Sequence, residues 1–177
     1  MELLVLLFIF VVFLFGTPIG LSYLIFHWIK KKEFDKIYRL LAIVPLILVG
    51  YFIYDAFYPN TDFYKTDFKE VTTLDFPQNG KILYKTASFP DQFGDYTSSF
   101  LAEFNEEYIK KLEVNLKIKN FVSKENEMSS NELDYIEKRK GNIKYSAQYI
   151  NDKEVGKYYS IGFLDDKKSV IVTRVSW

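Results

Sequence analysis

The segment LLVLLFIFVVFLFGTPIGLSYLIFHW, residues 3–28, decides the fold because no charged residue interrupts it. A helix that spans a bilayer needs about 20 apolar residues at roughly 1.5 Å rise each. Gly16, Pro18 and Gly20 would weaken an exposed soluble helix, but Gly and Pro are more frequent in membrane helices, where neighbouring helices can bond the freed carbonyls. We therefore predict a first membrane span over residues 3–28.

A second apolar run, LLAIVPLILVGYFIYDAF at residues 40–57, predicts a second span. Tyr51, Tyr54 and Tyr58 mark its end, and tyrosine rings, with one apolar and one polar side, suit the headgroup level of a bilayer. Asp55 is expected in water at the outer interface, although it could instead pair with a partner helix.

The loop between the two runs, residues 29–39, predicts the topology. It contains Lys30, Lys31, Lys32, Lys36 and Arg39 against two acidic residues. Short loops rich in Lys and Arg stay in the cytoplasm. Residues 1–58 are therefore expected to form a two-pass hairpin in the cytoplasmic (inner) membrane, in contact with membrane lipid. The N-terminus and a domain of residues 59–177 would then lie outside.

Two other interpretations of the first run are less consistent with the sequence. A cleaved signal peptide would have a basic start and a small-residue cleavage site, whereas the second residue here is Glu2, no basic residue precedes the apolar run, and no such site follows. A soluble helical hairpin would leave more apolar surface than a small partner domain can cover.

Composition limits the chemistry of the remaining chain. There is no cysteine, which excludes disulfides, thiolate catalysis and zinc–cysteine sites. From residue 60 onward, 18 Lys and Arg face 19 Asp and Glu, so no basic surface indicates nucleic-acid binding. The single histidine, His27, is interpreted as a helix-end anchor. No glycine-rich nucleotide loop, cofactor motif or catalytic triad is recognisable.

The pattern of residues 59–177 predicts an α+β domain with an antiparallel sheet, in the order α-β-β-α-α-β-β-β. Residues 59–75 are expected to form a turn followed by a short helix capped by Thr61 or Asp62. Two further helices are expected after Asn105 and from Ser129–Ser130 to near Gly141. Alternating residues and polar turns predict strands at residues 81–89, 96–104, 142–150, 157–164 and 169–177, with a short strand at 117–122.

One connection between predicted strands combines several features of a recognition loop. Its candidate residues are Phe89, Asp91, Phe93, Gly94, Asp95 and Tyr96. Binding residues often lie on loops that a rigid scaffold holds. Asp91 and Asp95 could also ligate a cation weakly, or could shape the loop by bonding their own backbone. The tyrosines at 145, 149, 158 and 159 are similarly open to two interpretations, an exposed patch or sheet packing.

These observations favour a membrane-anchored, non-enzymatic interaction protein of the bacterial cell envelope, without cofactor. Its outer domain would bind another protein, as an immunity or accessory protein does. A structural subunit of a membrane assembly is the first alternative, supported weakly by Gly16, Gly20 and Gly50. An envelope enzyme that uses only carboxylates is the second.

Overall fold

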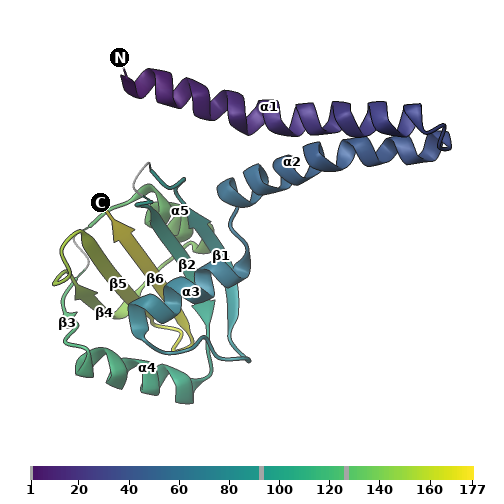
Figure 1. Cartoon of the computed structure of the whole chain (residues 1–177). Coiled ribbons are helices and arrows are strands. Elements are labelled where there is room, and N and C mark those ends of the chain that lie inside the picture. The colour runs from purple at the N-terminus through teal and green to yellow at the C-terminus, as the bar shows by residue number, and fades with distance from the viewer. Residues whose placement is uncertain (1, 92–93, 126–127) are drawn as a thin grey trace. The chain divides into compact units, whose positions relative to one another are not determined.

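The computed structural model describes residues 2–91, 94–125 and 128–177 (Figure 1). Side chains are described from residue 12 onward, residue 14 excepted. The chain divides into two compact units, Met1–Ala56 and Phe57–Trp177.

The first unit is helical. Its elements are α1 (Glu2–Lys31), the 3-10 helix η1 (Lys36–Ile43) and all of α2 (Val44–Phe57) except Phe57. Pro45 is the second residue of α2, in the first turn, where a missing amide hydrogen costs no helical bond. η1 packs on α1, and the Arg39 guanidinium lies 6.0 Å from the centre of the Phe26 ring.

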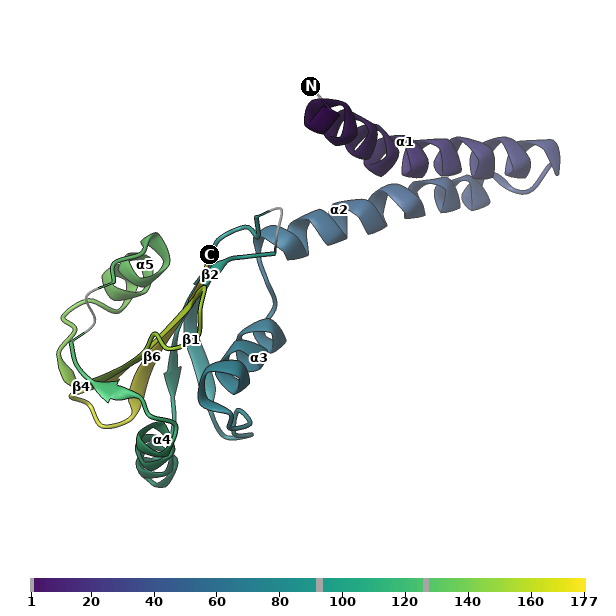
Figure 2. The ribbon, with the colours of Figure 1, turned by 60° about the vertical axis from the view of Figure 1, so that its left-hand side comes forward.

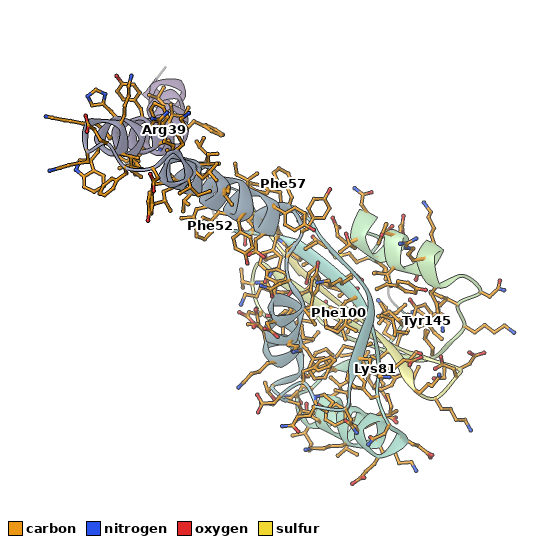
Figure 3. All side chains as sticks on the ribbon, turned by 90° about the vertical axis from the view of Figure 1, so that its right-hand side faces the viewer. Arg39, Phe52, Phe57, Lys81, Phe100 and Tyr145 are labelled. Atoms are coloured by element: carbon orange, nitrogen blue, oxygen red, sulfur yellow. The ribbon has the colours of Figure 1, made fainter. Side chains whose placement is uncertain are left out.

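Apolar side chains in this unit face outward. Among described residues 12–56, only Pro18, Ile29 and Ala42 are buried. Phe52, labelled in Figure 3, is 66% exposed. Over the described part of the chain, one helical stretch, within Lys36–Thr72, is long and apolar enough to cross a membrane by length and composition. The predicted span at residues 40–57 is therefore supported. The described residues of α1 contain no second stretch that meets the same criteria.

The second unit has the predicted α+β architecture. Its helices are α3 (Thr61–Thr72), α4 (Glu106–Ile118) and α5 (Asn131–Lys140). Its strands are β1 (Lys81–Ala87), β2 (Thr97–Glu103), β3 (Val122–Ser123), β4 (Tyr145–Asn151), β5 (Lys157–Leu164) and β6 (Ser169–Ser176).

All six strands form one antiparallel sheet in the order β1-β2-β6-β5-β4-β3. β1 and β2 form a hairpin, and β4, β5 and β6 form a meander. The two groups join through β2 and β6, with Phe100 opposite Val172. α3 and α4 cover one face of the sheet, and α5 lies on the other (Figure 2).

The larger core lies between the sheet and the two helices α3 and α4. Phe100 and Phe68 are fully buried there, with Leu112 and Leu116 from α4. A smaller core joins α5 to the other face through Leu133, Ile136, Leu101, Leu164 and Ile171.

Helix caps explain where the helices begin. The predicted caps Asn105 and Ser130 accept from the Tyr108 and Leu133 amides, at 2.8 and 3.1 Å. For α3 the prediction of Thr61 or Asp62 was wrong, because Asn60 accepts from the Asp62 and Phe63 amides. The short strand predicted at residues 117–122 was placed too early, because α4 continues to Ile118 and β3 begins at Val122.

Candidate functional site

The predicted recognition loop is organised mainly by its own backbone. The Asp91 carboxylate accepts from the Asp95 amide at 3.0 Å, and the Asp91 amide donates to the Asp95 carbonyl at 2.9 Å. Gly94 has a φ of +84°, a conformation that favours glycine. The Asp91 side chain thus shapes this turn, as one sequence interpretation held, whereas Asp95 takes part through its backbone amide and carbonyl. Phe89 is exposed, and Phe93 lies outside the described residues.

Tyr96 leaves the loop and joins a polar cluster beneath α3. Its hydroxyl donates to Asp67 Oδ1 at 2.6 Å, and the Arg174 guanidinium lies 4.1 Å from the centre of its ring. The structure therefore separates Tyr96 from the other loop candidates and brings it together with residues of α3 and β6.

Asp67 is the centre of this polar cluster. Asp67 is 1% exposed, and the Ser98 hydroxyl donates to its Oδ2 at 2.5 Å. Burial raises the pKa of Asp67, and this effect outweighs the hydrogen bonds from Ser98 and Tyr96 and the charge of Arg174, which lower it. A carboxyl group with both oxygens bonded can stay inside a core at modest cost.

Glu70 extends the cluster one helical turn along α3. Arg174 Nε donates to its Oε2 at 3.1 Å, and Lys157 Nζ and the Tyr159 hydroxyl donate to its Oε1 at 3.2 and 3.0 Å. Burial would raise the pKa of Glu70, but the Arg174 hydrogen bond and charge, with the other donors, hold it below its usual value. Burial, together with the hydrogen bond to Glu70 and its charge, raises the pKa of Tyr159 to about 12.

This arrangement ties α3 to the ends of β2, β5 and β6. Both carboxylates accept hydrogen bonds from residues of their own domain. The cluster therefore stabilises the packing of α3 on the sheet, and its geometry does not indicate a catalytic acid–base pair. No three His, Asp or Glu side chains gather to hold a metal ion in the part of the chain that the structure describes.

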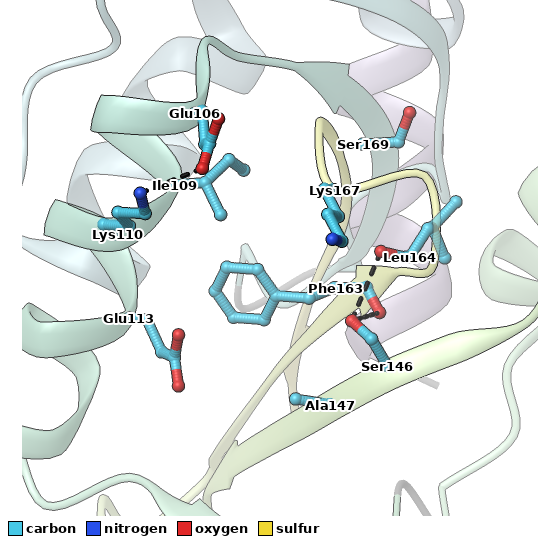
Figure 4. Close-up of a pocket in the computed structure, with 10 residues that line it drawn as sticks. All are labelled: Glu106, Ile109, Lys110, Glu113, Ser146, Ala147, Phe163, Leu164, Lys167 and Ser169. Carbon is cyan, nitrogen blue, oxygen red and sulfur yellow. Dashed lines mark hydrogen bonds and ion pairs between the residues drawn. The ribbon is translucent and has the colours of Figure 1, made fainter.

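A recess between α4 and the sheet offers open space for a ligand. It encloses about 270 Å³. Figure 4 shows the Phe163 ring projecting toward α4, between Ile109 and Ala147. The remaining lining residues are Glu106, Lys110, Glu113, Ser146, Leu164, Lys167 and Ser169.

The rim of this recess carries positively and negatively charged side chains. Lys110 pairs with Glu106 at 2.9 Å, and Lys117 pairs with Glu113 at 3.0 Å. The hydrogen bond from Lys110 lowers the pKa of Glu106, and the one from Lys117 lowers the pKa of Glu113, which also accepts from the Tyr149 hydroxyl. The rim is therefore ionised at neutral pH, while the floor is apolar.

The size of the recess limits what it can hold. Pockets for drug-sized ligands and cofactors usually enclose about 300–1,000 Å³. At about 270 Å³ this one lies just below that range. Its volume is enough for one large apolar side chain.

Sequence reasoning missed both sites. Asp67 follows Tyr64 by three residues and precedes Phe68, which places it on the apolar face of α3 and could have indicated a buried carboxylate. Lys167 lies in the polar turn between β5 and β6, and such a turn gives no signal of a binding recess. The tyrosines form no common patch, because Tyr149, Tyr158 and Tyr159 are buried, which confirms sheet packing.

Comparison with protein-family models, with curated proteins and with solved structures finds no match for this chain.

Proposed function

We propose that the chain is a two-pass protein of the cytoplasmic membrane whose outer domain binds another protein without catalysing a reaction. One observation carries the proposal: in the described helical unit, large apolar side chains surround the helices and almost none is buried. Water would make such a surface costly, whereas lipid would not. An immunity protein and an accessory subunit of an envelope complex both have this organisation.

The two-span topology rests on α1, α2 and the lysines between them. α1 covers 30 residues, enough to cross the hydrocarbon core with tilt. The last residue of α1, the turn after it and the start of η1 carry Lys31, Lys32 and Lys36, which favour the cytoplasmic side. Residues 1–58 then form the membrane hairpin, and residues 59–177 lie outside.

The recess on the outer domain supports binding of a protein. Interfaces gain most of their affinity from a few large side chains that enter desolvated pockets, surrounded by polar contacts. The floor of Phe163 and Ala147, with an ionised rim at Lys110 and Glu113, has this form. The expected partner presents an apolar side chain flanked by both charges.

A fusion experiment tests the topology. A reporter that works only in the periplasm or outside the cell, placed after Trp177, should be active, and the same reporter placed after Glu33 should be silent. A C-terminal fusion active only in the cytosol would overturn the proposed orientation.

A photo-cross-linking experiment in the native cell tests the recess. A photoreactive residue at Lys110 should form one protein adduct that is lost when Ala147→Leu fills the recess. The matched position is Lys111, which lies about 100° around α4 and points away from the recess. An adduct that forms equally from Lys111, or that survives Ala147→Leu, would contradict the proposed site.

A structural subunit remains the second candidate function. Added Cβ atoms at Gly20 and Gly50 would meet nothing within 4 Å, so both glycines leave room for the backbone of another helix. Replacing the hairpin with an unrelated two-span anchor distinguishes the two functions. The interaction protein should keep its activity, and the structural subunit should lose it.

A further inference from the structure

One end of the outer domain exposes apolar side chains from three separate connections. Phe89 follows β1 by two residues, Val155 precedes β5 by two, and Trp177 directly follows β6. Their exposed fractions are 59%, 99% and 63%. We call these three residues the apolar end.

Sheet pairing brings the three residues together. Ala87 lies opposite Ser98, Thr97 opposite Val175, and Ser176 opposite Lys157, so the three connections share one end of the sheet. The Trp177 amide also donates to the Gly156 carbonyl at 3.0 Å, and the Ser88 amide to the Thr97 carbonyl at 2.8 Å. Figures 1 and 2 both place the C-terminus beside the ends of β1 and β2. The apolar side chains are thus presented by backbone that is bonded to the sheet.

The connection to the apolar helix points to the same end. Phe57, the last residue of α2 and the first of the outer unit, has its ring 5.1 Å from that of Phe89. Only residues 58–60 separate α2 from Thr61, a reach of about 15 Å. Lys85 Nζ donates to the Pro59 carbonyl at 2.9 Å and holds this linker against β1.

We propose that the apolar end rests in the interfacial region of the lipid bilayer, so that Phe89, Val155 and Trp177 insert among the headgroups. This inference depends on the membrane anchoring proposed above. Trp is enriched at membrane–water interfaces because its ring is apolar and its indole N–H is polar. A domain tethered by three residues keeps this end close to the bilayer, so insertion costs little additional entropy.

The charges near the apolar end indicate which lipid suits it. Segments 91–95 and 152–157 together contain four carboxylates and two lysines. Insertion therefore relies on apolar contact, and anionic lipid should oppose it. Contact is expected to be stronger on phosphatidylcholine than on bilayers rich in phosphatidylglycerol.

The recess lies at the other end of the same strands. Phe163 and Leu164 end β5 and Ser169 begins β6, whereas Lys157 and Ser176 mark the apolar end. An eight-residue strand covers about 25 Å at roughly 3.3 Å per residue. A domain seated on its apolar end would hold the recess away from the lipid, open to a partner.

Fluorescence of the full chain in phosphatidylcholine nanodiscs tests the proposal. The chain has two tryptophans, so Trp28→Phe leaves Trp177 as the only reporter. Lipids with a spin label near the headgroup should quench Trp177 at least twofold more than lipids labelled near the chain end. Adding Phe89→Ser and Val155→Ser should reduce this quenching at least twofold, and Val114→Ser should leave it unchanged. Val114 is also exposed but belongs to α4, far from the C-terminus in Figures 1 and 2.

The reverse variant separates this inference from the anchoring on which it rests. In Trp177→Phe, Trp28 reports on the helical unit alone. If lipid quenches Trp28 but not Trp177, the chain is anchored and the apolar end does not touch the bilayer, which overturns the inference. If lipid quenches neither tryptophan, the proposed anchoring itself is wrong.

Discussion

The two units of this chain place polar and apolar groups in opposite ways. In residues 12–56, exposed Leu, Ile, Phe and Val side chains surround the helices, and burial is confined to a few small contacts among the described residues. In residues 57–177, aromatic rings fill the interior, and even a carboxylate, Asp67, is buried with its donors. The difference supports the proposal that the first unit lies in lipid and the second in water.

The largest expected effect tests whether aromatic residues serve different purposes in the two units. Phe100 is fully buried between the sheet and α3, and Phe→Ala changes in such cores cost about 3–5 kcal/mol. Phe100→Ala should lower the free energy of unfolding of the outer domain by about 4 kcal/mol. Urea unfolding of the full chain in mild detergent, followed by pulse proteolysis, measures it.

Phe52→Ala is the matched control in the helical unit. Phe52 is exposed on α2, so its loss should leave the unfolding of the outer domain unchanged. A decrease as large as that for Phe100→Ala would mean that the two units share one core, contrary to the comparison.

A somewhat smaller effect tests the solvent of the exposed residues. Leu48 lies in α2 and is about half exposed. An arginine near the centre of a membrane helix costs about 2.5–3.5 kcal/mol of insertion free energy. Leu48→Arg should therefore reduce the fraction of the chain that resists alkaline extraction from membranes.

Val114→Arg provides the comparison in the outer domain. Val114 has a similar exposure on α4, where we expect water to surround it. This variant should stay in the membrane as fully as the parent chain. If Leu48→Arg also stays fully inserted, α2 does not lie in the hydrocarbon core.

Local sequence patterns predicted much of this fold, because a helix cap and the alternation of apolar and polar residues in a strand each depend on only a few neighbouring residues. Asn105, Ser130 and the polar turns between β4, β5 and β6 are examples. The pairing of β2 with β6 could not be predicted in this way, since these strands are about 70 residues apart and no local signal selects that neighbour.

The candidate sites were harder to predict for the same reason. The recess combines α4 with β4, β5 and β6, so its lining residues share no sequence window. Asp67 resembles an ordinary helix-surface acid until α3 is packed on Ser98 and Tyr96. Conversely, Asp91 and Asp95 were candidate binding residues in the sequence because the residue types that form turns are also common in binding loops.

The smallest expected effect concerns the buried carboxylates of the outer domain, and its sign differs between two neighbours. The pKa of Asp67 is raised in the folded state, whereas in the unfolded state it is near 3.8. At pH values just above 3.8, the folded chain therefore keeps a proton that the unfolded chain has lost. Its contribution to stability therefore falls as the pH rises above that value. Asp67→Asn cannot ionise, and it should gain stability relative to the parent chain between about pH 4 and pH 7.

Glu70→Gln should show the opposite slope. Because the pKa of Glu70 is lowered, its stabilisation is present above the unfolded value of 4.5 and is lost as the pH falls. The Gln variant should be less stable than the parent by about 1 kcal/mol at pH 7 and nearly equal to it at pH 3. Urea unfolding at several pH values measures both slopes. Parallel slopes for the two variants would show that Asp67 is ionised as easily as Glu70, and the buried cluster would then resemble a surface ion pair.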